Sequence, residues 1–202
     1  TARPKRPAPT SIRRWWPWSW PSCPAVLELP YIFGAQPGRR PVWLFLIEMI
    51  RSMPGMTFYP RGGSAMVTVK QVGQAIAGAL ERNRGGHRYP IGYDNLTWVE
   101  MLRVIHRAMG LPNRRIVNIP TWLFRIGLIP RVRQHQKRNL DSGLNLIQFA
   151  PVMAANLFID KSLGCDLLGV EADDIEAAIT DSVRLCLEIL DGRSNGLDMR
   201  GE

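Results

Sequence analysis

Short apolar segments alternate with segments of helical periodicity from residue 25 onward, and this alternation limits the possible folds more than any other feature. Composition and Gly or Pro punctuation predict strands over residues 25–29, 65–69, 87–91 and 115–119. Helical spacing predicts helices over residues 39–53, 70–82, 97–110, 120–127 and 173–192. Alternating strands and helices are typical of an α/β domain with a parallel sheet. Residues 139–156 are apolar but weakly periodic, so we expect short helices and loops there.

Capping residues set the clearest helix boundaries. Thr97 is followed three residues later by Glu100, the spacing of a capping box, and Gly110 is a typical helix stop. Asp173 and Glu176 have the same spacing, so we expect Asp173 to cap the last helix. These signals predict where two helices begin without any tertiary information.

The 70–82 helix is amphipathic. Its small residues Gly73 and Ala77 suggest that it lies close to a sheet. The apolar face that we expect at helical spacing consists of Val69, Val72, Ile76, Ala79 and Leu80. This face should pack against the core.

The first 24 residues differ in composition from the rest of the chain. They hold six of the 16 prolines, four of the seven tryptophans, and five basic residues with no acid. So many prolines exclude a regular helix or strand. We predict a flexible or non-native leader over residues 1–24, a domain over residues 25–192 and a flexible tail over residues 193–202. The alternative for the leader is a basic, Trp-rich arm that binds membrane interfaces or nucleic acid.

Cysteine and histidine placement argues against metal or disulfide chemistry. Cys23, Cys165 and Cys186 are far apart, with no Cys-x-x-Cys pair, and the three histidines are scattered. We therefore expect no metal site and a reducing, cytoplasmic location. The apolar run 42–50 is too short to span a bilayer and is interrupted by Glu48, so no transmembrane segment is expected.

Three segments carry a resemblance to a known family. Residues 26–35 predict a strand that leads into a Pro-bounded loop closed by Gly34, residues 66–73 predict a strand-to-helix unit, and Ile91-Gly92 precedes the Thr97 cap. In this order they resemble the second half of extended short-chain dehydrogenase/reductases, the NAD-dependent epimerase/dehydratase family. The resemblance implies a partial Rossmann-like parallel sheet with a small, mostly helical substrate domain.

The resemblance also assigns candidate site residues. It implies that Pro30, Tyr31 and Ile32 contact the cofactor, NAD or NADP in the full-length protein. Phe33, Arg39 and Arg61 are the candidates for binding a small-molecule substrate. Without the resemblance, the apolar residues of this loop would be assigned to the core, and Arg39 to a solvated surface.

The chain lacks two features that the family's chemistry needs. No Gly-rich turn between a strand and a helix is present to bind a pyrophosphate. None of the four tyrosines has a Lys four residues later, so the Tyr/Lys pair for proton transfer is absent and no catalytic residue is assigned. Ser64 and Lys70 also stand where sugar-nucleotide enzymes carry Arg and Asp. We therefore predict the substrate-side portion of an NAD(P)-dependent oxidoreductase without its cofactor half, inactive and without bound cofactor when alone.

Two alternatives remain open at this level. The chain could be a non-catalytic binding domain of the same fold. It could also be a basic module for nucleic acid or membrane surfaces, since residues 114–138 hold seven Lys or Arg and no acid. We favour a solvated face for this run and expect no specific nucleic-acid partner. We read His106 as structural, Asp94-Asn95 as a turn, and expect self-association through an exposed sheet edge.

Overall fold

The structure is a computed structural model that describes residues 24–35, 41–83, 86–127, 129 and 152–193. The strands are β1 (Val26–Glu28), β2 (Tyr31–Phe33), β3 (Met56–Pro60), β4 (Gly63–Thr68), β5 (Arg88–Pro90), β6 (Asp94–Thr97), β7 (Arg115–Ile119) and β8 (Asn156–Leu157). The helices are α1 (Leu44–Ser52), α2 (Val69–Arg82), α3 (Trp98–Ala108), α6 (Cys165–Leu168) and α7 (Ile175–Leu190), with a 3-10 turn at Lys161–Leu163. Residues 121–127 are also helical.

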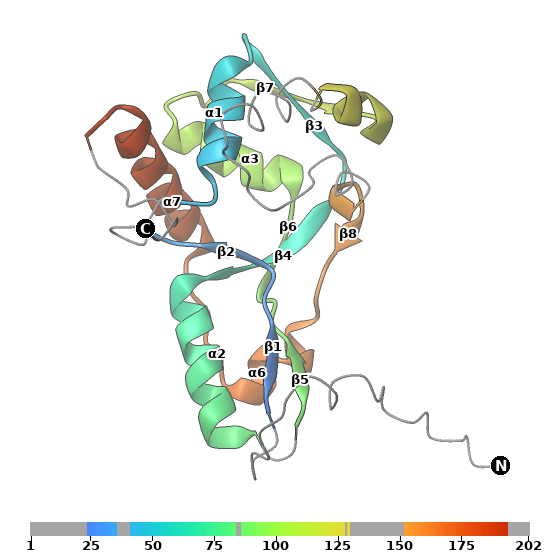
Figure 1. Ribbon diagram of the computed structural model, residues 1–202, viewed down its shortest axis with the longest axis vertical. Helices are drawn as coiled ribbons and strands as arrows, with labels where there is room; N and C mark the ends of the chain where they lie inside the picture. The colour runs from blue at the N-terminus through green and yellow to red at the C-terminus, as the bar shows by residue number, and fades with distance from the viewer. Residues whose placement is uncertain (1–23, 36–40, 84–85, 128, 130–151, 194–202) are drawn as a thin grey trace, which may run out of the picture.

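Parallel pairing dominates the sheets. β1 pairs with β5, β2 with β4, β3 with β7, and β8 with β4, all in parallel. Figure 1 shows α2, β1 and β5 at one end and α1, α3, β3 and β7 at the other, with β2 and β4 crossing between them. The expected α/β fold with parallel strands is thereby confirmed.

One strand departs from the parallel arrangement and corrects a sequence expectation. β6 pairs antiparallel with β4, so that Asp94 lies opposite Met66 and Asn95 opposite Ala65. The turn expected at Asp94-Asn95 is therefore wrong. These residues favour turns by local propensity, but the backbone of β4 offers hydrogen bonds that hold them extended.

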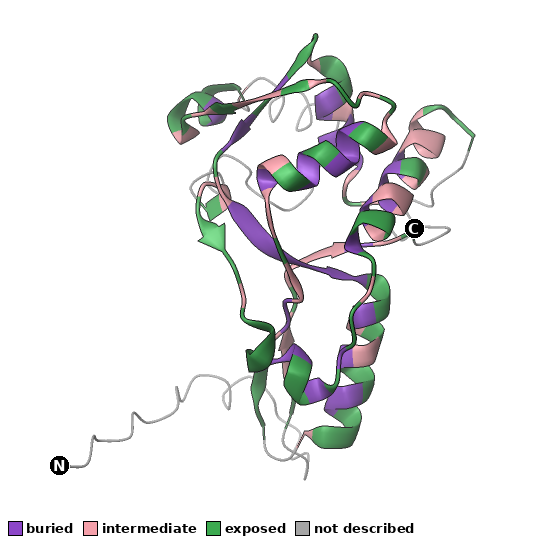
Figure 2. Cartoon of the chain, turned by 180° about the vertical axis from the view of Figure 1, so that it is seen from behind, coloured by how far each residue is buried: buried purple, intermediate pink, exposed green. Residues whose placement is uncertain are grey.

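Strand β4 separates two apolar cores. All six of its residues are buried, and Figure 2 shows the strand in the buried colour along its length. Because successive side chains point to opposite faces, Met66 belongs to the core built with α1, α3 and α7, and Val67 to the core built with α2 and α6. The strand is thus enclosed on both sides, which explains its continuous apolar character.

Helix boundaries follow the capping residues in one case and depart from them in another. Thr97 Oγ1 accepts from the Glu100 backbone N–H at 3.3 Å, and Glu100 Oε2 accepts from the Thr97 N–H at 2.8 Å, so the capping box is confirmed. Helix α7 is instead capped by Asp174, which accepts from the Ala177 N–H at 2.9 Å. The cap expected at Asp173 is wrong because that carboxylate contacts α2.

The apolar face expected for α2 is confirmed at Ala79 and at the partly buried Val72, and is wrong at its three other members. The exposed fractions of Val69, Ile76 and Leu80 are 47%, 48% and 83%. The buried residues of the helix are Gln71, Ala75, Gly78 and Ala79. Helix α6 packs on this other face, where Gly78 lets the Leu168 carbonyl approach, whereas Gly73 and Ala77 are exposed. Small residues, rather than the larger apolar ones, therefore decide which side of α2 meets the core.

Several smaller expectations change. Residues 31–33 form strand β2 rather than a loop, because they pair with residues 66–68 of β4. Helix α1 begins at Leu44, later than expected, and β3 and β8 were not expected at all. Residues 1–23, 36–40 and 130–151 lie outside the described residues. The leader, the tail beyond Arg193 and the part of the basic run from residue 130 onward therefore stay sequence predictions.

Two glycines of α2 give a matched test of this packing. An added Cβ at Gly78 would overlap the Leu168 carbonyl oxygen, whereas one at Gly73 meets nothing within 4 Å. We expect Gly78→Ala to lower the free energy of unfolding by about 1–3 kcal/mol, as overpacking does. Gly73→Ala should raise it by up to about 1 kcal/mol through helix propensity. Urea unfolding followed by circular dichroism measures both, and equal effects would contradict the packing of α2 on α6.

Candidate functional site

An aromatic cluster surrounds β2 at the end of the molecule formed by α1 and α3. The Phe33 ring stacks on Trp43 with centroids 4.2 Å apart, and Tyr31 contacts Trp98 edge-on at 5.2 Å. Trp43 Nε1 donates a 2.9 Å hydrogen bond to the Ile32 carbonyl, which fixes the indole against the strand. The cluster therefore joins β2 to the segments that precede α1 and open α3.

Strand alternation divides the residues proposed for cofactor and substrate binding. Tyr31 and Phe33 face the core that contains α1 and α3, whereas Ile32 packs against the core that contains α2. Phe33 is only 1% exposed. Pro30 is half-buried between β1 and β2. The structure thus places Tyr31 and Phe33 together and Ile32 on the opposite face, and their binding roles stay predictions.

Only one of the two arginines assigned to substrate binding lies among the described residues. Arg61 lies exposed in the bend between β3 and β4, and Arg39 lies outside the described residues. The next residue, Gly62, accepts a 3.0 Å hydrogen bond from the Trp98 backbone N–H, which ties this bend to the start of α3. Arg61 is therefore carried on an anchored bend close in sequence to β4.

The buried phenols in this region are unsuited to proton transfer. Burial raises the pKa of Tyr31, and burial together with the nearby Tyr31 raises that of Tyr59 far above its ordinary value. A phenol that acts as a base needs the opposite shift, which a neighbouring cation supplies. Lys161 lies 5.4 Å from the ring centroid of Tyr93, over the ring face, as a cation–π contact.

His106 has the structural role expected from its helix position. Its ring is buried, and Nε2 lies 3.0 Å from the Thr57 hydroxyl oxygen of β3. Burial, and then the positive charge of Arg114, lower the pKa of His106. A neutral imidazole bonded to Thr57 therefore fastens α3 to β3.

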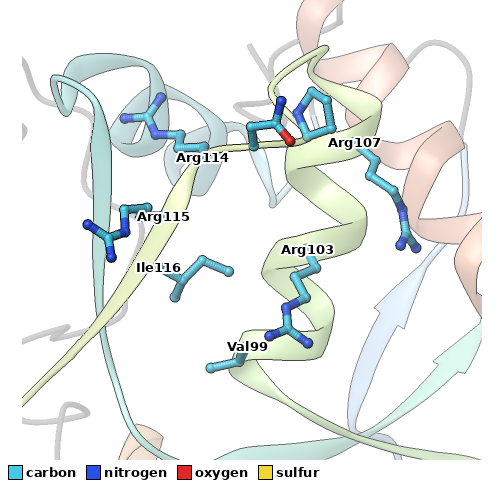
Figure 3. Close-up of a pocket in the computed structure, with 8 residues that line it drawn as sticks. Val99, Arg103, Arg107, Arg114, Arg115 and Ile116 are labelled. Atoms are coloured by element: carbon cyan, nitrogen blue, oxygen red, sulfur yellow. The ribbon is translucent and has the colours of Figure 1, made fainter.

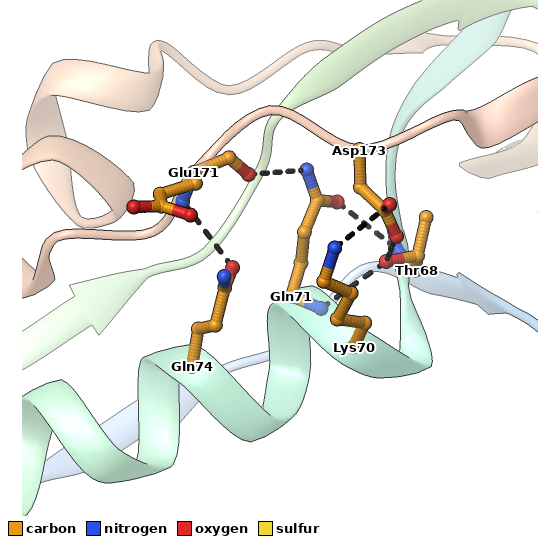
Figure 4. Close-up of polar contacts among 6 residues, drawn as sticks. All are labelled: Thr68, Lys70, Gln71, Gln74, Glu171 and Asp173. Atoms are coloured by element: carbon orange, nitrogen blue, oxygen red, sulfur yellow. Dashed lines mark hydrogen bonds and ion pairs between the residues drawn. The ribbon is translucent and has the colours of Figure 1, made fainter.

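A network of polar contacts closes the amino end of α2 (Figure 4). Thr68 and Gln71 form a reciprocal capping box, with bonds of 3.1 and 3.0 Å. Asp173 accepts from the Thr68 hydroxyl at 2.6 Å and from Lys70 at 3.4 Å. Gln71 Nε2 also donates to the Glu171 carbonyl at 3.1 Å. The segment that leads into α7 is thereby fixed on the start of α2.

This network tests whether a dinucleotide fits the described residues. A pyrophosphate binds where a strand turns into a helix and leaves backbone N–H groups open. At the β4–α2 junction the Asp173 carboxylate already accepts a hydrogen bond from the Thr68 cap. At the β6–α3 junction the Glu100 carboxylate accepts one from the Thr97 backbone N–H. These junctions do not fit the cofactor's phosphates, and no step of chemistry is assigned through it.

Asp94 is the most unusual carboxylate near this network. One of its oxygens, Oδ2, is buried and has no hydrogen-bond partner among the described residues. Burial, followed by the charges of Asp173 and Asp174, raises the pKa of Asp94. Its position was missed from sequence because only the antiparallel pairing of β6 brings it beside residues almost 80 positions away in the chain.

The described part of the chain was found to hold neither a metal-binding cluster nor a membrane-spanning helix. No group of three or more His, Cys, Asp or Glu side chains gathers there in a way that could hold a metal ion. Among the same residues, no helix is long and apolar enough to cross a membrane. Cys165 and Cys186 are both free and buried.

Comparison with solved structures finds the same fold in several proteins. The protein gox2253 aligns with a TM-score of 0.55 at 17% identity, over 85% of this chain and 50% of its own. A nucleoside-diphosphate-sugar epimerase from Pseudomonas aeruginosa aligns with a TM-score of 0.53 at 16% identity, over 85% of this chain and 49% of its own. A UDP-glucose 4-epimerase from Bifidobacterium longum, solved with NAD+ and UDP, aligns with a TM-score of 0.51 at 11% identity, over 84% and 48%.

These alignments define the class of fold. The chain has the Rossmann-like α/β fold of epimerases, as the sequence predicted, and it spans about half the length of the structures it matches. No family model matches the sequence, and no curated protein matches it either.

Asp173 gives a test of the network at α2. Its hydrogen bond from Thr68, and then the charge of Lys70, lower the pKa of its carboxyl group. A lowered folded-state pKa contributes stability above the unfolded value of about 3.9, and this contribution is lost as the pH falls below it. We expect Asp173→Asn to cost about 1 kcal/mol of unfolding free energy at pH 7 and less at pH 3. The more exposed pair partner gives a control, Lys70→Gln, which should cost less at pH 7. A pH-independent effect of Asp173→Asn would contradict the role of the charge.

Proposed function

We propose that this chain is the substrate-side portion of an NAD(P)-dependent oxidoreductase of the epimerase/dehydratase type. In the whole protein, the reaction would be hydride transfer between a nicotinamide and a substrate C–OH carbon. The Gly-rich turn and the Tyr/Lys pair would come from the other half of the enzyme, which this chain does not contain. A cytoplasmic location accords with this role.

The observation that carries the proposal is that β1 and β2 each have one edge without a partner strand among the described residues. Each of these strands has one parallel partner in the described chain, β5 and β4 respectively. Their other edge is unpaired within the described residues. An unpaired parallel edge is suited to receive a further strand, and in this fold the additional strands would carry the cofactor. The half-length alignment to epimerases supports the same arrangement.

The exposed apolar face of α2 supports the proposal independently. Ile76 and Leu80 are largely solvent-exposed, one helical turn apart, and Val69 lies at the start of the same helix. Large apolar side chains on one helix face usually meet a partner surface. The helices that flank the missing strands would cover this face.

Within this proposal the aromatic cluster forms the wall of the substrate site. Tyr31, with Pro30, would approach the nicotinamide side, and Phe33 would shape the wall from behind. Ile32 lies on the opposite face of β2, so its cofactor contact would come from the α2 side of the strand. Arg39 and Arg61 would meet an anionic substrate group. No catalytic residue is assigned to this chain, because its buried phenols have raised pKa values.

Cofactor titration tests directly whether the isolated chain lacks a cofactor site. The strand-to-helix junctions at α2 and α3 are closed by carboxylates, so we expect no saturable binding of NADH or NADPH to the isolated chain. Isothermal titration calorimetry at physiological salt is the measurement, and turnover should be absent as well. Saturable binding at about micromolar cofactor would place a cofactor site in this chain and disprove the proposal that the other half of the enzyme supplies it.

Self-association tests the exposed face of α2. We expect the chain to self-associate, and we expect the double variant Ile76→Glu with Leu80→Glu to shift it toward the monomer in sedimentation velocity. Both positions are exposed, so the unfolding free energy should change little. The matched control is Val42→Glu, which adds a charge at an apolar residue 89% exposed outside α2. If the control dissociates the assembly equally, general charge repulsion rather than this face is responsible.

A further inference from the structure

A basic groove lies between helix α3 and strand β7, away from the aromatic cluster (Figure 3). Its volume is about 410 Å³, which is in the range of small-ligand sites. The residues that line it are Val99, Arg103, Arg107, Pro112, Asn113, Arg114, Arg115 and Ile116. We call this hollow the arginine groove.

Sequence spacing on α3 explains which residues form the helical wall of the groove. Val99, Arg103 and Arg107 recur every four residues, so they share one face of the helix. This face is turned away from the buried stripe that contains Trp98 and Ile105. The turn after α3 brings the chain back as β7, so that Arg114 and Arg115 line the same hollow. In Figure 3 the Arg115 guanidinium points away from α3.

Two of the four arginines have a structural role. Arg107 donates a 2.7 Å hydrogen bond to Glu176 at the start of α7. Arg114 donates to the backbone carbonyls of Met53 and Met56. Its Nε, however, is buried without a hydrogen-bond partner among the described residues.

Arg103 and Arg115 lack the structural hydrogen bonds that Arg107 and Arg114 make. Both are exposed, and within the described part of the chain neither side chain has a hydrogen bond or an ion pair. Figure 3 shows the Arg103 side chain between α3 and β7, near Val99. The charge of Arg103 contributes, after the hydrogen bonds from Thr97, to the lowered pKa of Glu100 on the same helix. The groove therefore has positive charge that its own carboxylates do not fully compensate.

We propose that the arginine groove binds the phosphate group of a small molecule. Guanidinium groups bind phosphate oxygens through paired, charge-assisted hydrogen bonds, and Arg103 has its donors available for them. Val99 and Ile116 give the hollow an apolar side that suits the organic part of such a ligand. A hollow bounded by one helix and one strand fits a small ligand better than a duplex or a membrane, which need an extended basic surface. This site is separate from the proposed substrate wall and does not depend on it.

Titration of the 202-residue chain with inorganic pyrophosphate tests the proposal. We expect saturable binding in calorimetry, weakened about ten-fold or more by Arg103→Gln because two charge-assisted hydrogen bonds are lost. Arg103→Lys should lose less affinity, since it keeps the charge and loses only the paired geometry. Circular dichroism and thermal unfolding of each variant establish that the fold is unchanged. The basic residues of the first 24 positions are common to all variants and cancel in the comparison.

The control is Arg88→Gln, at an exposed arginine whose guanidinium is already paired with Glu28. Arg88 is an exposed arginine in a second hollow lined by Arg82, His87, Tyr89, Leu167 and Leu168, at the other end of the molecule. We expect this variant to bind pyrophosphate as the wild type does. Equal weakening by both substitutions, or the absence of saturable binding up to about 1 mM, would overturn the proposal. Binding of duplex DNA or phosphatidylserine vesicles that Arg103→Gln abolishes, without pyrophosphate binding, would also overturn it and indicate a macromolecular surface.

Discussion

The structure depends on the enclosure of strand β4. Its backbone is paired on one edge with β6 and on the other with β2 and β8, and its side chains alternate between two cores. Met66 holds α1, α3 and α7 on one face, and Val67 holds α2 and α6 on the other. A strand enclosed in this way has a strongly specified register, because a slip of one residue would exchange the two faces. Every candidate site is positioned relative to this strand.

The carboxyl end of the same strand shows how this chain differs from a dinucleotide-binding unit. In a parallel α/β fold, the turn from strand to helix is where backbone N–H groups meet a phosphate. Here Thr68 and Gln71 satisfy the helix end internally, and Asp173 adds a negative charge beside it. The network stabilises the connection to α7 and makes the junction unfavourable for an anion. The positive charge available to a ligand lies instead in the arginine groove, on the side of α3 that faces β7.

The candidate site was predictable only in part. Residues 30–33 could be singled out because an apolar strand meets a proline and a glycine there, but whether each side chain faces one core or the other depends on pairing with β4. Arg103 and Arg107 could have been found from their spacing of four residues on a helix with a clear cap. That Arg114 and Arg115 line the same hollow could not be found, since it requires the turn after α3 to bring β7 back beside the helix.

The sequence by itself determined the elements whose signals are local. Thr97 and Glu100 fixed the start of α3, Gly110 and Gly192 fixed helix ends through their positive φ, and the alternation of strands and helices determined the α/β class. Tertiary structure alone decided the direction of β6, the buried side of α2 and the partner of Asp173. These depend on contacts between distant residues: Gly78 admits the Leu168 carbonyl, and Thr68 binds a carboxylate 105 positions away. Local propensity carries no information about such pairs, and the burial of backbone and side chains against one another settles them.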